Sequence, residues 1–192
     1  MQRDDDRLVD AALGGDMRAF ELLMEKHESK MYAVALRMCA NREDAQDCLQ
    51  DAMLRIYKAL PSFKGQSSFS TWAYRITMNT CLDELRRKKV RQAASLDQML
   101  EVGWSPVDEE NSTERHVDNQ ELKRNLSKAI QTLPEEMRAA VVLRDVQGFS
   151  YDEIASMLST NVGTVKSRIS RGREKLREIL SKDRELFGIS GV

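Results

Sequence analysis

The spacing of apolar residues predicts helices over most of the first 90 residues. Apolar positions recur every three or four residues, which is the period of a helix that buries one face. Asp16 and Asn41 precede two of these stretches as N-cap residues do, and Pro61 ends the second of them. The expected helices cover residues 8–13, 16–40, 41–60 and 70–89. The loop before the last of them is rich in serine.

Residues 91–120 lose this periodicity. They contain Gly103, Pro106 and a run of acidic residues, with few apolar positions, and this composition indicates a flexible linker. Helical periodicity returns after it, and Pro134 favours the start of a further helix that Gly148 ends. The expected units are a first domain over 1–90, the linker over 91–120, a second domain over 121–182 and a C-terminal tail over 183–192.

Residues 150–180 have the pattern of a helix-turn-helix. Ser150 and Glu153 form a Ser-x-x-Glu capping box, which predicts a helix start. Residues 159–161 are Ser-Thr-Asn and make the turn. Along the helix that follows, one side carries Val162, Val165, Ile169, Leu176 and Ile179.

The opposite side of this second helix is polar and basic. With Val165 facing the core and a step of about 100° per residue, the outward residues are Thr164, Ser167, Ser170, Arg171 and Glu174. The flanks carry Lys166, Arg168, Arg173 and Lys175. Such a helix enters the major groove of DNA, where outward residues contact bases and flanking cations neutralise phosphates. Glu174 is unfavourable there unless it pairs with a cation, and the alternative interpretation is a solvated basic face.

Composition supports an all-α fold and localises the charge. The 192 residues include only 9 Gly and 3 Pro, while 32% are charged and 41% hydrophobic, which favours folded helices. The net charge of −1 conceals a net −6 over residues 91–122 and a net +5 over residues 123–182. A basic second domain behind an acidic linker indicates a polyanionic partner.

Cysteine usage and the absence of enzyme motifs narrow the class of protein. Cys39, Cys48 and Cys81 form no CxxC pair, so we interpret them as small buried residues in a reducing cytosol. His27 and His116 are isolated, and we therefore expect no zinc site, no other cofactor and no small-molecule substrate. No catalytic Ser/His/Asp or Cys/His set and no glycine-rich phosphate loop appears. Without a signal peptide or a membrane span of about 18 apolar residues, we expect a cytoplasmic protein.

The serine loop and the helix after it combine aromatic, hydroxyl and basic side chains. These are Phe63, Lys64, Ser67, Ser68, Phe69, Trp72, Tyr74, Arg75, Asn79 and the basic run that begins with Arg86 and Arg87. Aromatic faces with cations suit unstacked bases of a single strand. The alternative is that the aromatic residues, Trp72 and Tyr74 above all, belong to the core.

The helix over 41–60 carries an acidic stripe. Glu43, Asp44, Asp47 and Asp51 recur at helical spacing, with Gln50, Leu54 and Arg55 beside them. Two interpretations stay open, namely a solvated face and a docking surface for a basic protein helix.

Several of these motifs together resemble the extracytoplasmic-function sigma factors of the sigma-70 family. They comprise residues 44–51, 69–76, 133–134, 151–155 and 162–168, with Asn79, Asp83 and Arg86. The resemblance spans residues 8–182 in the family's order. Two departures are Cys48, where the family more often has a branched aliphatic residue, and Ser170, where some members place an aromatic residue.

The resemblance implies a transcription initiation factor that does no chemistry of its own. Its partners would be core RNA polymerase (the β′ clamp helices and the β flap), promoter DNA and an anti-sigma factor that is often membrane-anchored, in control of a stress regulon. Polymerase contacts would be Asp44, Asp47, Gln50, Asp51, Leu54 and Arg55. The −10 element would meet Phe63, Lys64, Ser67, Ser68, Phe69, Ser70, Thr71, Trp72, Arg75, Asn79, Arg86 and Arg87. The −35 element would meet Thr164, Lys166, Ser167, Arg168, Ser170, Arg171, Arg173 and Lys175.

A second hypothesis is a conventional helix-turn-helix regulator with an N-terminal ligand or dimerisation domain. Such a protein would bind a palindrome by itself, as a dimer. The serine and aromatic loop before Trp72 would then have no role.

Overall fold

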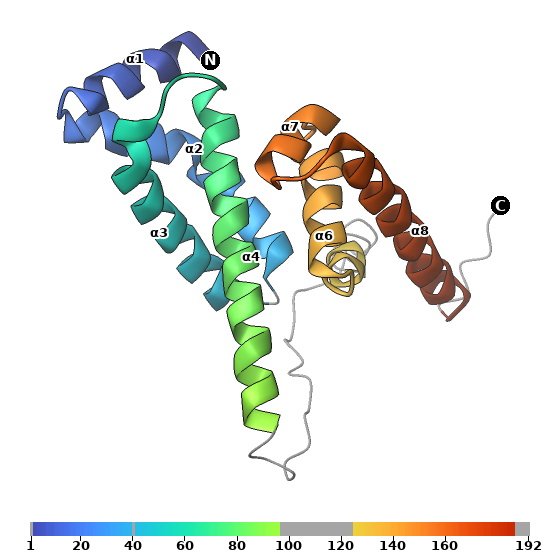
Figure 1. Ribbon diagram of the computed structural model, residues 1–192. Helices are drawn as coiled ribbons and strands as arrows, with labels where there is room; N and C mark the ends of the chain where they lie inside the picture. The colour runs from blue at the N-terminus through green and yellow to red at the C-terminus, as the bar shows by residue number, and fades with distance from the viewer. Residues whose placement is uncertain (1, 40, 97–124, 187–192) are drawn as a thin grey trace, which may run out of the picture.

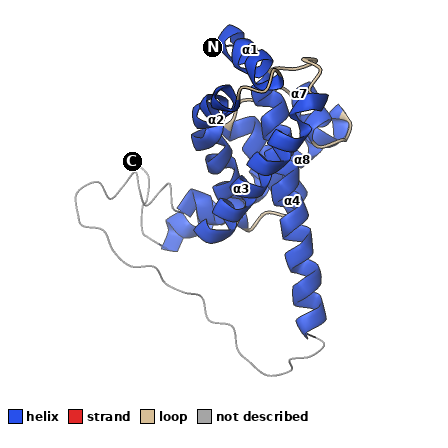
Figure 2. Ribbon diagram, turned by 90° about the vertical axis from the view of Figure 1, so that its left-hand side faces the viewer, coloured by secondary structure: helices blue, strands red, loops and turns tan. Residues whose placement is uncertain are grey.

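The computed structural model describes residues 2–39, 41–96 and 125–186, and these residues form helices joined by turns and loops, with no strand among them (Figures 1 and 2). The expected all-α fold with two helical domains is therefore confirmed. The first half contains α1 (Gln2–Leu13), α2 (Met17–Met38), α3 (Arg42–Ala59), the 3-10 turn η1 (Leu60–Ser62) and α4 (Phe69–Leu96). The second half contains helical residues 125–131, α6 (Glu135–Val141), the π-helical turn η2 (Val142–Val146), α7 (Tyr151–Met157) and α8 (Val162–Leu186).

The helix starts of the first half follow the expected caps. The Asp16 carboxylate accepts hydrogen bonds from the backbone amides of Arg18 (2.9 Å) and Ala19 (3.2 Å). The Asn41 side chain accepts one from the amide of Asp44 (2.8 Å). Each cap gives a partner to amides that the first turn of a helix leaves without one.

The first half is a bundle in which α2, α3 and α4 pack together and α1 lies across α2 and α4 (Figure 1). Its largest fully buried side chains are Leu23, Met31, Val34, Met38, Ile56, Phe69 and Met78. Each such side chain contributes about 1.5–3 kcal/mol of burial free energy. The core therefore holds the α3 and α4 surfaces in a fixed relation.

Two helices of the first half are longer than the pattern predicted. Helix α1 begins at Gln2, and the acidic residues in its first turn interact favourably with the positive N-terminal end of the helix dipole. Helix α4 continues to Leu96, so residues 91–96, which we expected in the linker, are helical. No Gly or Pro interrupts α4, and Glu84 pairs with both Arg87 and Arg91 along it. Residues 97–120 of the expected linker, His116 and the end of the tail (187–192) lie outside the described residues.

The second half contains the expected helix-turn-helix. Ser150 and Glu153 form the complete capping box at the start of α7, and Ser159 turns the chain with a φ of 49°. The Asn161 side chain then accepts a hydrogen bond from the amide of Thr164 (2.8 Å) at the start of α8. The π-helical turn after α6 was not predicted, and neither was the N-cap position of Pro134.

The two halves pack against each other at the C-terminal end of α2. Arg138 is 9% exposed and donates hydrogen bonds to the carbonyls of Met38 (2.5 Å) and Leu133 (3.1 Å). Gln131 donates another to the carbonyl of Cys39 (3.1 Å). These bonds supply partners for carbonyls that the end of a helix leaves unpaired.

An aromatic contact adds to this interface. The ring of Tyr74 on α4 lies 5.5 Å from that of Phe149, edge to face. Burial raises the pKa of Tyr74 to about 12, so its hydroxyl stays protonated. Tyr74 is 5% exposed and belongs to the core and the interface between the halves.

Candidate nucleic-acid and polymerase interfaces

Helix α8 presents the face that its periodicity predicted. Val165, Ile169 and Leu176 are buried, whereas Ser167 and Arg171 are exposed. Lys166, Ser170, Glu174 and Lys175 are exposed as well, and Thr164 is half-buried. Among the described residues, Arg171 and Lys175 have no ion-pair partner, and Glu174 pairs with neither of them.

Two cations that we expected on phosphates are instead held within the second half. Arg168 forms an ion pair with Glu136 of α6. The Arg173 Nε donates to the Asp145 carboxylate of η2 at 3.0 Å, and this hydrogen bond raises the pKa of Arg173. Both acids are 28 or more residues away along the chain, so helical spacing gave no sign of them. Helix α8 therefore has fewer unpaired cations for DNA phosphates than its composition alone indicates.

A basic cluster beside the start of α8 was missed by the sequence analysis. The guanidinium of Arg144 lies 4.7 Å from the centre of the Tyr151 ring, and the Lys166 ammonium lies 5.6 Å from it. Arg144 also donates to the carbonyl of Phe149 (2.8 Å). Cation–π contacts of this kind hold two positive charges near the N-terminal end of the helix. In the sequence, the only sign of this cluster was an isolated arginine, Arg144, before a turn.

The aromatic residues before and within α4 form a cluster of their own. The ring centres of Phe63 and Trp72 are 5.0 Å apart, and those of Phe69 and Trp72 are 5.7 Å apart. Phe69 is 1% exposed. Its ring fills the bundle core and is not accessible to a base, so the expected DNA contact of Phe69 is corrected to a core role. Phe63 and Trp72 are half-buried and keep part of their surface exposed.

Serine and threonine hydroxyls organise the start of α4. The Ser68 Oγ lies 2.9 Å from the Ser70 Oγ and 2.8 Å from the Thr71 Oγ1, and it accepts from the Thr71 amide at 3.1 Å. Ser68 therefore caps the helix, and Ser70 and Thr71 hydrogen bond to its hydroxyl; all three are half-buried. Ser67 and Lys64 stay exposed in the loop, where Gly65 has a φ of 67°.

One face of α4 carries exposed polar and basic residues. Arg75, Asn79 and Arg86 are four and seven residues apart, which places them on one side of the helix, and all three are exposed. Arg87 is exposed on a neighbouring face and pairs with Glu84. Within the part of the chain that the structure describes, the side-chain amide of Asn79 makes no hydrogen bond, so it is available to a ligand.

The acidic stripe of α3 divides into exposed and structural residues. Asp47, Gln50, Asp51 and Leu54 are exposed, with Leu54 at 51%. Asp44 instead pairs with Lys88 of α4. Burial lowers the pKa of Lys88, but the hydrogen bond to Asp44 and the nearby negative charges, above all those of Asp44 and Glu84, together outweigh burial and raise the pKa overall. Arg55 donates to Asp83 of α4 at 3.1 Å. Asp44 and Arg55 thus tie α3 to α4, and the other four form a surface that we call the α3 face.

The fold and these surfaces define a two-domain helical protein with a helix-turn-helix in its second half. Family models for sigma-70 region 2 and sigma-70 region 4 match residues 23–91 and 123–176. The chain is 37% identical over 183 residues to the RNA polymerase sigma-H factor of Pseudomonas aeruginosa, covering 93% of this chain and 95% of that protein. It is 35% identical over 179 residues to the ECF RNA polymerase sigma-E factor of Escherichia coli, covering 91% and 93%.

The chain therefore belongs to the sigma-70 family, in its extracytoplasmic-function group, and is a sigma factor. The resemblance stated from the motifs is confirmed, and the alternative of a conventional regulator is not favoured. The relatives are sigma factors, which are not enzymes.

Solved structures agree with this assignment. The sigma factor RpoE in complex with the anti-sigma factor NepR from Bartonella quintana aligns with a TM-score of 0.69 and 27% identity, covering 88% of this chain and all 100% of that one. CnrH in complex with the cytosolic domain of CnrY aligns with a TM-score of 0.68 and 26% identity, covering 94% and 99%. Among the described helices of this chain, none has the length and apolar character needed to cross a membrane.

Proposed function

We propose that this sigma factor docks on core RNA polymerase through the α3 face and directs it to promoters through two separate DNA contacts. Helix α8 would read the −35 element as duplex, and the loop over 62–70 with α4 would capture the −10 element. The observation that carries the proposal is the division of α8 into a buried apolar side and an exposed side with Ser167, Ser170 and Arg171.

The −35 contact follows from the chemistry of the exposed side of α8. Arg171 can donate two hydrogen bonds to guanine O6 and N7, and Ser167 or Ser170 can bond either partner of a base pair. Lys166 and Lys175 are placed beside them for phosphates, with Thr164 at the first turn. Arg168 and Arg173 would reach phosphates by leaving Glu136 and Asp145, or would position α8 by staying paired.

The −10 contact uses the exposed face of α4 and the loop before it. Asn79 offers a donor and an acceptor to the edge of an unpaired base, and Arg75, Arg86 and Arg87 supply positive charge for the strand. In the loop, Lys64 and Ser67 are exposed, and Trp72 and Phe63 offer partly exposed rings. Ser68, Ser70 and Thr71 would act by shaping the loop. Phe69 is not part of this surface.

The α3 face suits a basic protein helix with an apolar ridge. Asp47 and Asp51 are one turn apart and exposed, and Leu54 follows on the same side. Carboxylates around a leucine would pair with cations of the β′ clamp helices while the leucine is covered. The second domain, 121–182, would contact the β flap.

Two weak DNA contacts on one chain act together. With the domains at 1–90 and 121–182 joined through 91–120, and a tail over 183–192, the second contact becomes intramolecular once the first has formed. We propose that a membrane-anchored anti-sigma factor blocks these surfaces until a stress signal arrives. In the two aligned structures, the sigma factor RpoE is bound to the anti-sigma factor NepR, and CnrH is bound to the cytosolic domain of CnrY. The protein would work in the cytoplasm, where polymerase and promoter DNA meet.

Run-off transcription tests the proposal. Core RNA polymerase with the full chain should initiate at a small set of sequences from a promoter library, and core polymerase alone should not. Specific binding of a palindromic site by the chain alone, without any promoter-directed transcription, would overturn the proposal. A pull-down of core polymerase with the full chain separates a failure of docking from a failure to recognise DNA.

A further inference from the structure

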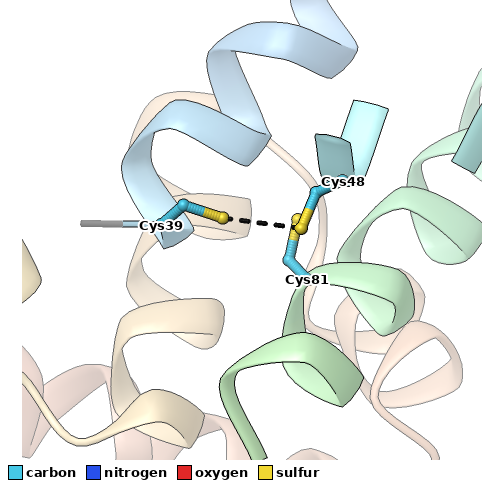
Figure 3. Close-up of side chains that lie close together, drawn as sticks. All are labelled: Cys39, Cys48 and Cys81. Carbon is cyan, nitrogen blue, oxygen red and sulfur yellow. Dashed lines mark hydrogen bonds between the residues drawn. The ribbon is translucent and has the colours of Figure 1, made fainter. Parts of the chain in front are cut away.

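The three cysteines meet in one cluster inside the first half, although the sequence spreads them over 43 positions. Cys39 follows the last residue of α2, Cys48 lies on α3 and Cys81 on α4, and their side chains point toward one another (Figure 3). The three Sγ atoms all lie within 4.8 Å of one another, with 3.6 Å between those of Cys39 and Cys48. The expectation of burial is confirmed, because all three are at most 2% exposed. The sequence, which has no CxxC pair, did not predict that the three would meet.

The spacing of the sulfurs matches that of metal ligands. A metal–sulfur bond of about 2.3 Å places two sulfurs about 3.8 Å apart in a tetrahedral site and about 4.0 Å apart in a trigonal one. The Cys39–Cys48 Sγ distance of 3.6 Å and the upper limit of 4.8 Å for the other two pairs are within about 1 Å of these values. Rotation of a cysteine side chain supplies shifts of this size without moving a helix.

We propose that Cys39, Cys48 and Cys81 form a binding site for one thiophilic metal ion, and that its all-sulfur ligand set favours Cu(I). Among the described residues, no imidazole nitrogen or carboxylate oxygen joins the cluster as a fourth ligand. Structural zinc sites take four ligands, whereas soft thiolates without nitrogen or oxygen suit Cu(I). Binding exchanges up to three thiol protons for metal–sulfur bonds, and the metal stays Cu(I) throughout.

A small pocket with acidic lining lies beside the cluster. It has a volume of about 50 Å³ and lies between α3 and α4. Its lining consists of Asp44, Asp47, Cys48, Asp51, Arg55, Thr80, Glu84 and Arg87. Asp44 and Glu84 already pair with cations of α4, so Asp47 and Asp51 supply the negative charge that favours the approach of a metal ion. Cys48 is the lining residue that belongs to the cluster. The pocket therefore places negative charge beside a cluster whose members are at most 2% exposed.

The backbone around the cluster is held in place before any metal binds. The Cys39 amide donates to the Ala35 carbonyl at 2.8 Å, and the Cys39 carbonyl accepts from Gln131 at 3.1 Å. Cys48 and Cys81 lie within long helices that the bundle core fixes. Ligands on three rigid elements form a site with little ordering cost on binding. This inference does not rest on the proposed function, since metal binding can be measured on the chain alone.

Titration of the full chain tests the site. The reduced, metal-free protein is titrated anaerobically with Cu(I) against the chromophoric chelator bicinchoninate, and with Zn(II) in parallel. We expect one Cu(I) per chain by native mass spectrometry and sulfur-only coordination by X-ray absorption. Burial alone makes the three thiols slow to alkylate, so the rate is compared between the metal-free and the Cu(I)-bound folded chain, and bound Cu(I) should slow it further.

Substitutions identify the ligands. Cys39→Ser, Cys48→Ala and Cys81→Ala should each weaken Cu(I) binding by at least about 100-fold, because even residues behind the ligands are worth about 10–100-fold. Met78→Leu is the matched control, since Met78 is a buried sulfur residue on α4 outside the cluster. Circular dichroism restricts the comparison to folded variants, and the alkylation experiment needs no variant. Equal binding by a chain without cysteines, or no binding by wild type, would overturn the site; tighter four-coordinate Zn(II) binding would overturn the assignment to Cu(I).

Discussion

At the scale of single residues, packing sets requirements that helix propensity does not. Gly172 is buried where α8 crosses α6, and a Cβ at this position would lie 2.7 Å from the Cγ2 of Val141. In an exposed helix, Ala would be more stable than Gly by about 1 kcal/mol. Here the close approach reverses that preference.

Gly172→Ala should therefore destabilise the protein. Overpacking of a buried site costs about 1–3 kcal/mol, which exceeds the gain in helix propensity. The measurement is urea unfolding followed by circular dichroism, with Glu178→Ala on the exposed side of α8 as the control. A Gly172→Ala protein as stable as wild type would show that α6 and α8 are not in this contact.

His27 makes the stability of the first half depend on pH. It is 3% exposed, and its Nε2 lies 3.0 Å from an Asp5 carboxylate oxygen. Burial lowers the pKa of His27 below its ordinary 6.5, although Asp5 acts in the opposite direction. As pH falls below about 6.5, the unfolded chain takes up a proton at His27 before the folded chain does. The free energy of unfolding therefore falls as the pH is lowered, because of His27.

Unfolding measured at pH 7.5 and at pH 5.5 should show this loss. His27→Gln keeps a hydrogen-bonding group opposite Asp5 but does not titrate, so its free energy of unfolding should fall less over the same interval. All other titrating groups are common to both proteins. An equal fall in the two proteins would mean that His27 does not contribute.

At the scale of elements, the proposed −35 interface and the proposed contact with the β′ clamp helices are each one face of one helix. Helix α8 needs its buried side for α6 and α7 and offers the other side to DNA. Helix α3 likewise packs on α2 and α4 and leaves the α3 face exposed. Substitutions on the exposed sides should change binding without changing stability.

Arg171→Ala should weaken transcription from promoters that depend on the −35 element. Loss of a bidentate contact to guanine costs about 1–3 kcal/mol of discrimination, or about 5–150-fold. Arg177→Ala is the matched control, because Arg177 is exposed on α8 almost two turns further from its start. Run-off transcription from templates with intact and altered −35 elements makes the comparison. Equal losses for both variants would point to general electrostatics instead of base recognition.

Asp51→Lys should abolish most binding to core polymerase. The substitution reverses one charge of the α3 face and leaves a like charge opposite the basic partner. Glu28→Lys reverses an exposed charge on α2 and should leave binding intact. Pull-down of core polymerase with each full chain gives the answer. Unchanged capture by the Asp51 variant would place the docking surface elsewhere.

At the scale of the whole molecule, the two halves pack together in this structure. Arg138, Gln131 and Phe149 make the contacts with the first half. The −10 and −35 elements are about 25 base pairs apart, or about 85 Å of duplex at 3.4 Å each. The proposed binding of both elements on one promoter would spread the two halves along this length, and we expect these contacts to open.

Phe149→Ala combined with Gln131→Ala should open the free protein. Both changes remove contacts between the halves, and we expect a larger radius of gyration by small-angle X-ray scattering with unchanged helix content. Tyr57→Ala removes an aromatic contact within the first half, to Phe20, and should not enlarge the molecule. A radius that stays the same in the double variant would show that other contacts hold the halves together.

Local chemistry explains why much of the fold was predictable. The caps at Asp16, Asn41 and Ser150 and the two sides of α8 depend on residues three or four positions apart, so the chain alone determines them. The motifs that placed it among the sigma factors are equally local. The burial of Phe69 was harder to predict, because an aromatic residue at helical spacing fits both a core role and a base-stacking role.

Tertiary structure alone decided the features whose partners are distant in sequence. Arg138 meets a carbonyl 100 residues away, and Arg168 and Arg173 find acids 32 and 28 residues away. The cysteine cluster depends on how α2, α3 and α4 pack. Helical periodicity specifies which way a side chain faces along its own helix, but not which neighbour it meets, because that depends on the packing of separate elements.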